Sequence, residues 1–217
     1  MTYPAVLFDL DGTLLNTLDD LADASNRALA RHGLPTHSTE SFRYFVGDGV
    51  RNLVLRTLPE DRRDDQTLAK VLQDYRADYA RNWNVKTRPY PGIPELLDAL
   101  QAMRVKMAVL SNKPDADTRR CVSTLLPNWR FDHVLGAREG VPLKPDPAAA
   151  LEVTRVLEVP PPSFLFLGDT RMDVETALAA GMYPVGALWG FREREELVEA
   201  GAKALAAHPM DVARLVE

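Results

Sequence analysis

The chain has 217 residues and a formal net charge of −5, and its 46% hydrophobic and 26% charged residues are typical of a globular protein rather than a disordered one. It has no basic cluster of the kind that binds nucleic acid, and no apolar stretch reaches the ~18 residues that span a membrane. The single cysteine, Cys121, rules out an intrachain disulfide. Because the first residues also lack the features of a secretory signal, we expect a cytoplasmic protein.

Short apolar runs recur along the chain, each followed by polar or turn-forming residues. The strongest lie at 5–8, 107–110 and 164–167, and weaker ones lie at 131–137 and 184–188. Continuous runs of this kind are typical of strands that are covered on both faces of a parallel sheet. Helical patterns alternate with the runs, at 93–100, 115–126, 147–157 and 173–180. The alternation predicts an α/β fold, a doubly wound and Rossmann-like parallel sheet.

Residues 17–83 interrupt this alternation. Apolar residues share a helical face over 18–29 and again over 65–83, and no convincing strand lies between them. A turn-rich segment at 86–92 then leads back to the alternating pattern. We therefore predict an α/β core formed by residues 1–15 and 87–217, with a small helical cap formed by residues 16–86.

Polar side chains follow the three strongest predicted strands. Asp9 and Asp11 follow the first, Ser111 and Asn112 the second, and Asp169 the third. Since ligands of an open parallel sheet bind beyond the carboxyl ends of its strands, we expect these groups to converge. Carboxylates can share a small site when a divalent cation neutralises them, and Mg²⁺ prefers oxygen ligands. The pattern therefore predicts a Mg²⁺ site.

A carboxylate beside such a cation can act as a nucleophile toward a phosphoryl group. That chemistry also needs a lysine, a hydroxyl group and backbone N–H donors. The sequence offers Lys144 in a Lys-Pro-Asp-Pro turn, Ser111 after a strand, and Gly12 and Thr13 after the aspartates. The expected partner is a small-molecule phosphate ester.

Four segments resemble, in order, the motifs of the haloacid dehalogenase (HAD) superfamily of phosphohydrolases. They are Asp9–Thr13, Ser111–Pro114, Lys144–Pro147 and Gly168–Asp173. The helical insert is similar to the C1-type cap of that superfamily. Shorter segments, at 18–21, 45–51 and 187–191, resemble phosphoglycolate phosphatases.

The resemblance implies a catalytic role for three of these residues. Asp9 would be the nucleophile, and Asp11 would protonate the leaving alcohol and then activate the water that hydrolyses the aspartyl phosphate. Lys144 would neutralise charge on the phosphate and on Asp9.

The resemblance also implies the binding groups. The expected metal ligands are Asp9, Asp11 through its backbone carbonyl, Asp169 and Asp173. The expected phosphate-binding residues are Gly12, Thr13, Ser111 and Asn112. Asp173 is also explained by a favourable place at a helix N-terminus. Arg51, in the cap, is either a cation for a substrate carboxylate or a solvated side chain.

Together these features predict a Mg²⁺-dependent phosphomonoester hydrolase that acts through an aspartyl phosphate, on 2-phosphoglycolate or a similar small ester, as a monomer or homodimer. One alternative is a phosphomutase of the same superfamily, such as one that acts on β-glucose 1-phosphate. Another is a non-catalytic phosphate-binding protein, since fold does not fix function. A dehalogenase has no need of a leaving-group acid, and Asp11 argues against that activity.

Overall fold

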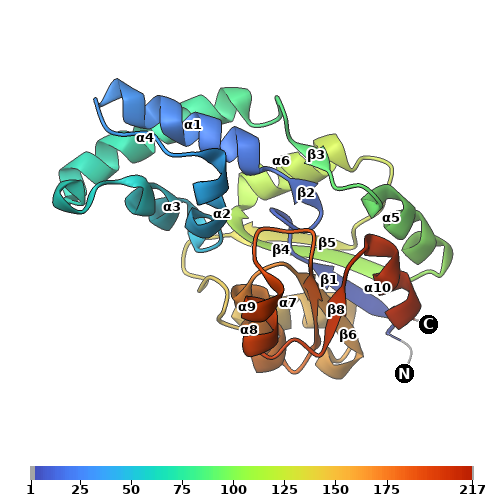
Figure 1. The fold of residues 1–217 in the computed structure, drawn as a ribbon. Helices are drawn as coiled ribbons and strands as arrows, with labels where there is room; N and C mark the ends of the chain where they lie inside the picture. The colour runs from blue at the N-terminus through green and yellow to red at the C-terminus, as the bar shows by residue number, and fades with distance from the viewer. Residues whose placement is uncertain (1–2, 217) are drawn as a thin grey trace. The chain divides into compact units, whose positions relative to one another are not determined.

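The computed structural model describes residues 3–216 (Figure 1). The chain divides into two compact units, one formed by Met1–Leu15 with Pro89–Glu217 and the other by Asn16–Arg88. It passes between them at β2 (Leu15–Asn16) and β3 (Arg88–Pro89), which pair with each other. Among the described residues, no helix combines the length and the apolar composition that crossing a bilayer requires.

The larger unit is built on a parallel sheet. Its strands are β1 (Ala5–Phe8), β4 (Lys106–Pro114), β5 (His133–Ala137), β6 (Phe164–Gly168), β7 (Tyr183–Ala187) and β8 (Ala204–Ala206). Within residues 3–216 they form a six-stranded sheet in the order β5-β4-β1-β6-β7-β8, and every neighbouring pair is parallel. The strand order reverses direction beside β1, which places a crevice at the carboxyl ends of the central strands. The predicted α/β fold is confirmed.

Helices cover both faces of this sheet (Figure 1). They are α5 (Ile93–Ala102), α6 (Asp115–Leu125), α7 (Ala148–Leu157), α8 (Arg171–Ala180), α9 (Arg194–Glu199) and α10 (Pro209–Val216). α5 connects β1 to β4 and α6 connects β4 to β5, in one direction along the sheet, whereas α7 and α8 connect β5 to β6 and β6 to β7 in the opposite direction. Right-handed crossovers therefore place these two pairs of helices on opposite faces of the sheet. α10 packs on α5, and α9 packs on α8.

The central strands are buried on both sides, as their continuous apolar runs predict. All four residues of β1 are inaccessible to solvent. On one face Leu7 of β1 and Phe166 of β6 pack with Val153 of α7 and Ala177 of α8. This burial fixes where each strand ends and therefore where the polar residues that follow it emerge.

Three details differ from the sequence prediction. β4 continues through Ser111 and Asn112 to Pro114, because its pairing with β5 resumes at Pro114 after a register shift beyond Leu110. Ser111 and Asn112 therefore lie within the strand rather than after it. β8 and α10 were not predicted, and a strand as short as the three residues of β8 carries too little periodicity to identify.

The smaller unit is helical. It contains α1 (Leu18–Arg31), α2 (Phe42–Phe45), α3 (Gly49–Thr57) and α4 (Asp65–Asn82). α1 packs along α4, and their buried faces include Leu21, Leu29, Leu68 and Val71. A specificity role for this unit stays a prediction.

A buried carboxylate joins the two long helices of this unit. Asp78 of α4, whose side chain is 3% exposed, accepts hydrogen bonds from Arg27 Nε and Nη2 (2.9 and 2.7 Å to Oδ1) and from Asn82 Nδ2 (3.1 Å). Arg31 adds an ion pair at 3.3 Å. Burial by itself would raise the pKa of Asp78, but the hydrogen bonds from Arg27 and Asn82 outweigh it and hold the pKa below its ordinary value.

We predict that Asp78→Ala destabilises the protein by about 1–3 kcal/mol at neutral pH, because Arg27 loses its hydrogen-bonded partner. Since the pKa is lowered on folding, this stability is present above the unfolded pKa, near 3.8, and is lost as pH falls through the folded value. Urea unfolding at several pH values measures both effects.

The matched control is Asp74→Ala, one turn earlier on α4, where a 35% exposed carboxylate pairs with His32. It should cost less than about 1 kcal/mol. Equal losses for the two variants would contradict the importance assigned to Asp78.

Candidate active site

Two neighbouring strands bring acidic residues to one edge of the sheet. Asp9 directly follows β1, and Asp169 directly follows β6. The strands are in register at Phe8 and Leu167, and the N–H of Asp9 donates to the carbonyl of Leu167 at 2.9 Å. The two carboxylates therefore emerge side by side, as the sequence predicts for the ends of parallel strands.

A buried lysine lies between two of the carboxylates. Nζ of Lys144 lies 2.8 Å from Oδ1 of Asp9 and donates a hydrogen bond to Oδ1 of Asp173 at 2.6 Å. It also donates to the carbonyl of Leu110 at 3.2 Å. Burial alone would lower the pKa of Lys144, but Asp173 and Asp9 raise it above its ordinary value. Lys144 is therefore charged across the working pH range.

Asp9 is the least satisfied of the buried carboxylates. Its Oδ1 is buried and accepts no hydrogen bond of acceptable angle from residues 3–216, although the Lys144 ammonium is close. Burial raises the pKa of Asp9 well above its ordinary value; Lys144 opposes this shift, and Asp173 and Asp169 add to it. A group with this much unmet charge is suited to bind a cation or to act as a nucleophile.

Asp169 is fully buried and held at both oxygens. Oδ1 accepts from Thr13 Oγ1 at 2.9 Å, and Oδ2 accepts from the N–H of Phe191 at 2.8 Å. Burial raises the pKa of Asp169 to about 7, with a further contribution from Asp173, and these two hydrogen bonds partly offset the shift. The carboxylate is fixed in position but lacks full compensation of its charge.

Asp173 serves two structural purposes at once. It stands in the first turn of α8 and forms a capping box with Thr170, whose N–H and Oγ1 donate to Oδ2 at 3.0 and 2.8 Å. Its other oxygen, Oδ1, faces Lys144. The residue therefore caps the helix and also lies in the acidic cluster, and its role as a metal ligand stays a prediction.

Glycines let the main chain pack directly against these carboxylates. A Cβ atom at Gly12 or Gly190 would clash with the side chain of Asp169, and one at Gly168 would clash with that of Asp173. Gly12 also has φ +92°, a conformation that favours glycine. The cluster thus depends on close backbone packing at these three positions.

The donors suit a hard divalent cation. Oxygen atoms of Asp9, Asp169 and Asp173 lie within 4.8 Å of one another, and all three residues are buried. The wider site holds four carboxylates against two ammonium groups, a formal charge of minus two. They belong to Asp9, Asp11, Asp169, Asp173, Lys113 and Lys144. The unsatisfied oxygen of Asp9 and this excess charge fit a bound cation such as Mg²⁺.

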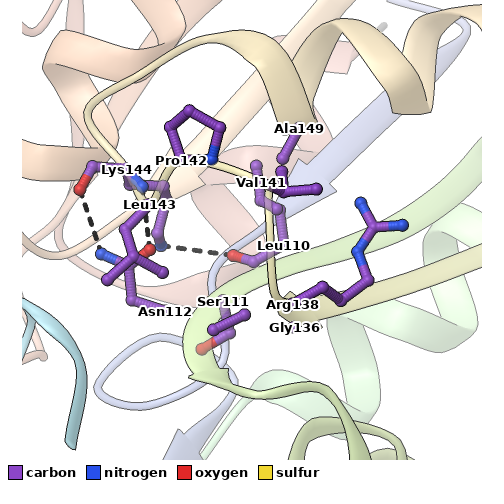
Figure 2. A pocket seen from close by; sticks show the side chains of 11 residues that line it. Leu110, Ser111, Asn112, Gly136, Arg138, Val141, Pro142, Leu143, Lys144 and Ala149 are labelled. Atoms are coloured by element: carbon purple, nitrogen blue, oxygen red, sulfur yellow. Dashed lines mark hydrogen bonds between the residues drawn. The ribbon is translucent and has the colours of Figure 1, made fainter.

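Asn112 is hydrogen-bonded through its side chain to the main chain of Lys144. Its Oδ1 accepts from the N–H of Lys144 at 2.9 Å, and its Nδ2 donates to the Lys144 carbonyl at 3.1 Å (Figure 2). These two bonds connect β4 to the segment before α7 and orient Lys144. The side chain of Asn112 therefore positions Lys144 in this structure, and the predicted phosphate-binding role of Asn112 stays a prediction.

Ser111 lies beside this pair, where Figure 2 shows it lining a hollow together with Asn112, Lys144 and the ends of β4 and β5. Its Oγ accepts from the N–H of Lys113 at 3.3 Å, so its own hydroxyl proton is available as a donor. Phosphate binding by Ser111 stays a prediction.

Gly12 and Thr13 form a tight turn after Asp11. The N–H of Gly12 donates to the carbonyl of Leu15 at 2.9 Å, and that of Thr13 to the carbonyl of Leu10 at 3.3 Å. Both amides predicted to bind phosphate therefore serve the turn here, and the hydroxyl of Thr13 serves Asp169. Their phosphate-binding role stays a prediction.

Arg51 belongs to the helical unit, on α3. Its guanidinium is largely exposed and lies 3.3 Å from Oδ1 of Asp65. This is the contact expected of a solvated side chain, and its predicted contact with substrate stays a prediction.

Sequence reasoning assigned no role to Lys113, and it noted the loop after β7 only through the resemblance of residues 187–191 to phosphoglycolate phosphatases. Nζ of Lys113 lies 3.0 Å from both oxygens of Asp11. In the loop, Trp189 Nε1 donates to the carbonyl of Thr13 at 2.9 Å, and Phe191 supports Asp169 as described. The one available signal was the Trp-Gly-Phe sequence, whose small residue between two aromatic ones is consistent with close packing at a strand end.

Comparison with known proteins agrees with this geometry. The family model of haloacid dehalogenase-like hydrolases matches residues 6–187, which include the acidic cluster and Lys144. The chain belongs to this family.

Relatives of this hydrolase are named as phosphatases. A phosphoglycolate phosphatase from Aquifex aeolicus is 33% identical over 186 residues, covering 86% of this chain and 85% of that protein. One from Nitrosospira multiformis is 32% identical, covering 98% and 95%. A solved structure from Lactobacillus delbrueckii subsp. bulgaricus, provisionally named a phosphoglycolate phosphatase, has a TM-score of 0.94 and 31% identity, and covers 100% of this chain and 99% of that one. The hydrolase is thus a phosphatase of this family.

We predict that Gly190→Ala lowers both the stability and the activity of the enzyme. The added methyl group would clash with Asp169, and relief of the clash should cost about 1–3 kcal/mol and displace that carboxylate. The melting temperature and the rate of phosphate release should both fall.

Gly33→Ala is the control for this prediction. An added Cβ at Gly33 meets no atom within 4 Å, but φ of +64° makes alanine strained there. This variant should lose stability and keep its activity per folded molecule. Unchanged activity in Gly190→Ala would show that Asp169 does not depend on this packing.

Proposed function

We propose that the hydrolase is a Mg²⁺-dependent phosphomonoesterase that acts through an aspartyl phosphate on Asp9, on 2-phosphoglycolate or a similar small ester. The observation that carries the proposal is the state of Asp9, a buried carboxylate with one oxygen unsatisfied, next to Lys144 and within reach of Asp169 and Asp173. The ester itself is inferred from the names of the relatives.

Asp9, Asp169 and Asp173 would hold the cation, with the backbone carbonyl of Asp11 as a further ligand. When bound, Mg²⁺ would neutralise carboxylate charge and polarise the phosphoryl group toward attack.

The two aspartates of the first motif would divide the chemistry. A carboxylate oxygen of Asp9 forms a bond to phosphorus while the bond to the ester oxygen breaks, and the carboxyl group of Asp11 gives its proton to the departing alkoxide. Asp11 then takes a proton from water as the water oxygen attacks the same phosphorus. The Asp9–phosphorus bond breaks, which releases inorganic phosphate and restores the Asp9 carboxylate.

Lys144 would stabilise charge through both steps. Its contacts with Asp9 and Asp173 hold the ammonium at the nucleophile, where it balances negative charge that gathers on the phosphoryl oxygens. The cytoplasmic location and the monomeric or homodimeric state stay predictions of the sequence.

We predict that Asp9→Asn lowers phosphate release from 2-phosphoglycolate roughly a thousandfold or more, since the nucleophile is lost. The fold should persist, because the amide has the shape of the carboxylate and removes repulsion from Asp169 and Asp173. Phosphate release and circular dichroism check the two parts.

Asp146→Asn is the matched control, since it changes an exposed aspartate in the turn after Lys144 whose Oδ1 accepts from the N–H of Ala148 at 2.8 Å. Its activity should match that of the wild type. A panel that also includes a sugar phosphate and a nucleotide, with Mg²⁺ and with EDTA, tests the ester. Normal turnover in Asp9→Asn, or in EDTA, would refute the mechanism.

We also predict that Mg²⁺ raises the melting temperature by several degrees at about pH 8 and by less at about pH 5.5. The sign follows from the raised pKa values of Asp9 and Asp169, the latter about 7, since protons occupy the ligands below those values and must be displaced. Thermal unfolding with and without Mg²⁺ at both pH values is the measurement.

Asp169→Asn should abolish the shift, and Asp61→Asn, an exposed aspartate of the helical unit, should preserve it. An equal shift at both pH values would argue that the ion binds elsewhere.

A further inference from the structure

We propose that Lys113 is a positioning residue for the reaction, with an ammonium group that holds the carboxylate of Asp11 in place for proton transfer. The inference rests on the proposed function, which makes Asp11 the acid and base.

Lys113 contacts both carboxylate oxygens of Asp11, and both side chains are largely shielded from solvent. Nζ of Lys113 donates to Oδ1 and to Oδ2 of Asp11, both at 3.0 Å, and the side chains are 4% and 12% exposed. A surface ion pair is worth little because water competes for both partners, whereas a buried ammonium requires a partner. Contact with both oxygens also centres the ammonium on the carboxylate, which limits the movement of the Asp11 side chain more than a contact with one oxygen would.

The backbone on both sides of this contact is fixed. Lys113 lies where β4 shifts register, its N–H donates to Ser111 Oγ, and its carbonyl accepts from Thr118 Oγ1 at 3.1 Å. Asp11 enters the tight turn whose amides donate to Leu10 and Leu15. The remaining freedom lies in the side chains, which the ion pair joins.

The two lysines of the site serve different aspartates. Lys144 contacts Asp9 and Asp173, so its charge is balanced by the nucleophile and by the acidic cluster. Lys113 contacts Asp11, two residues away from the nucleophile. This division keeps the acid–base carboxylate from competing with Asp9 for the same ammonium.

The proposal has a kinetic signature that a merely structural ion pair lacks. A general acid matters most when the leaving group is a poor one, such as an alkoxide, and least for a good one, such as p-nitrophenolate. Misplacing Asp11 should therefore slow alkyl esters more than aryl esters, without weakening substrate binding.

The experiment compares Lys113→Met, Lys113→Arg, Asp11→Asn and the double variant D11N/K113M on 2-phosphoglycolate and on p-nitrophenyl phosphate. Lys113→Met should lower kcat for the alkyl ester about tenfold or more, with KM within about threefold of wild type and a smaller loss on the aryl ester. Lys113→Arg should recover part of kcat, because a guanidinium can hold both carboxylate oxygens. The double variant should be no slower than Asp11→Asn, since Lys113 acts through Asp11.

Several results would overturn the proposal. A rise in KM that persists in the Asp11→Asn background would mean that Lys113 contacts the substrate. Equal losses of kcat on the two esters, accompanied by a lower melting temperature, would mean that the ion pair is only structural.

If Lys113→Met does not fold, the double variant, which removes both charges, still tests the proposal. A kcat below that of Asp11→Asn would contradict it. Unchanged kcat in Asp11→Asn would instead refute the role of Asp11, and an active Asp9→Asn would refute the proposed function itself.

Discussion

The buried contact between Lys144 and the carboxylates of Asp9 and Asp173 is the interaction on which the site depends. Carboxylates this close repel one another, and burial adds the cost of removing each from water. One ammonium offsets part of this cost and leaves residual negative charge, while burial, with a smaller contribution from the neighbouring carboxylates, raises the pKa of Asp9 and that of Asp169. That residual charge is the physical basis for expecting a divalent cation and for reactivity at Asp9.

The parallel sheet makes this arrangement possible at modest cost. Apolar strands packed between two layers of helices anchor the main chain up to the residue before Asp9 and before Asp169. The start of α8 supplies a capping box for Asp173, and the glycines at 12, 168 and 190 let backbone approach the carboxylates closely. The like charges are therefore held by rigid elements rather than by a flexible loop, which keeps the carboxylates in place.

Much of this could be predicted from the sequence, because the informative patterns are local. An apolar run that ends in aspartate indicates both a buried strand and the edge where its polar residue emerges, as for Asp9 and Asp169. Contacts between residues that are far apart in the sequence leave no such local pattern. Lys113 and Asp11 are 102 residues apart in the sequence, and the bonds from Asn112 to Lys144 join segments that are 32 residues apart. The clash that excludes a side chain at Gly190 arises from Asp169, 21 residues earlier, so a sequence window over the loop cannot reveal it.

The central claim is that Asp9 carries the phosphoryl group during turnover, and direct capture of that species is its most direct test. The wild-type enzyme would be mixed with ³²P-labelled 2-phosphoglycolate and Mg²⁺, quenched in acid within milliseconds, and the labelled peptide located after peptic digestion at low pH. We expect label on the peptide that contains Asp9, rising before free phosphate appears and released by hydroxylamine, as an acyl phosphate requires. Phosphate release without labelled protein, or label on any other residue, would contradict the mechanism.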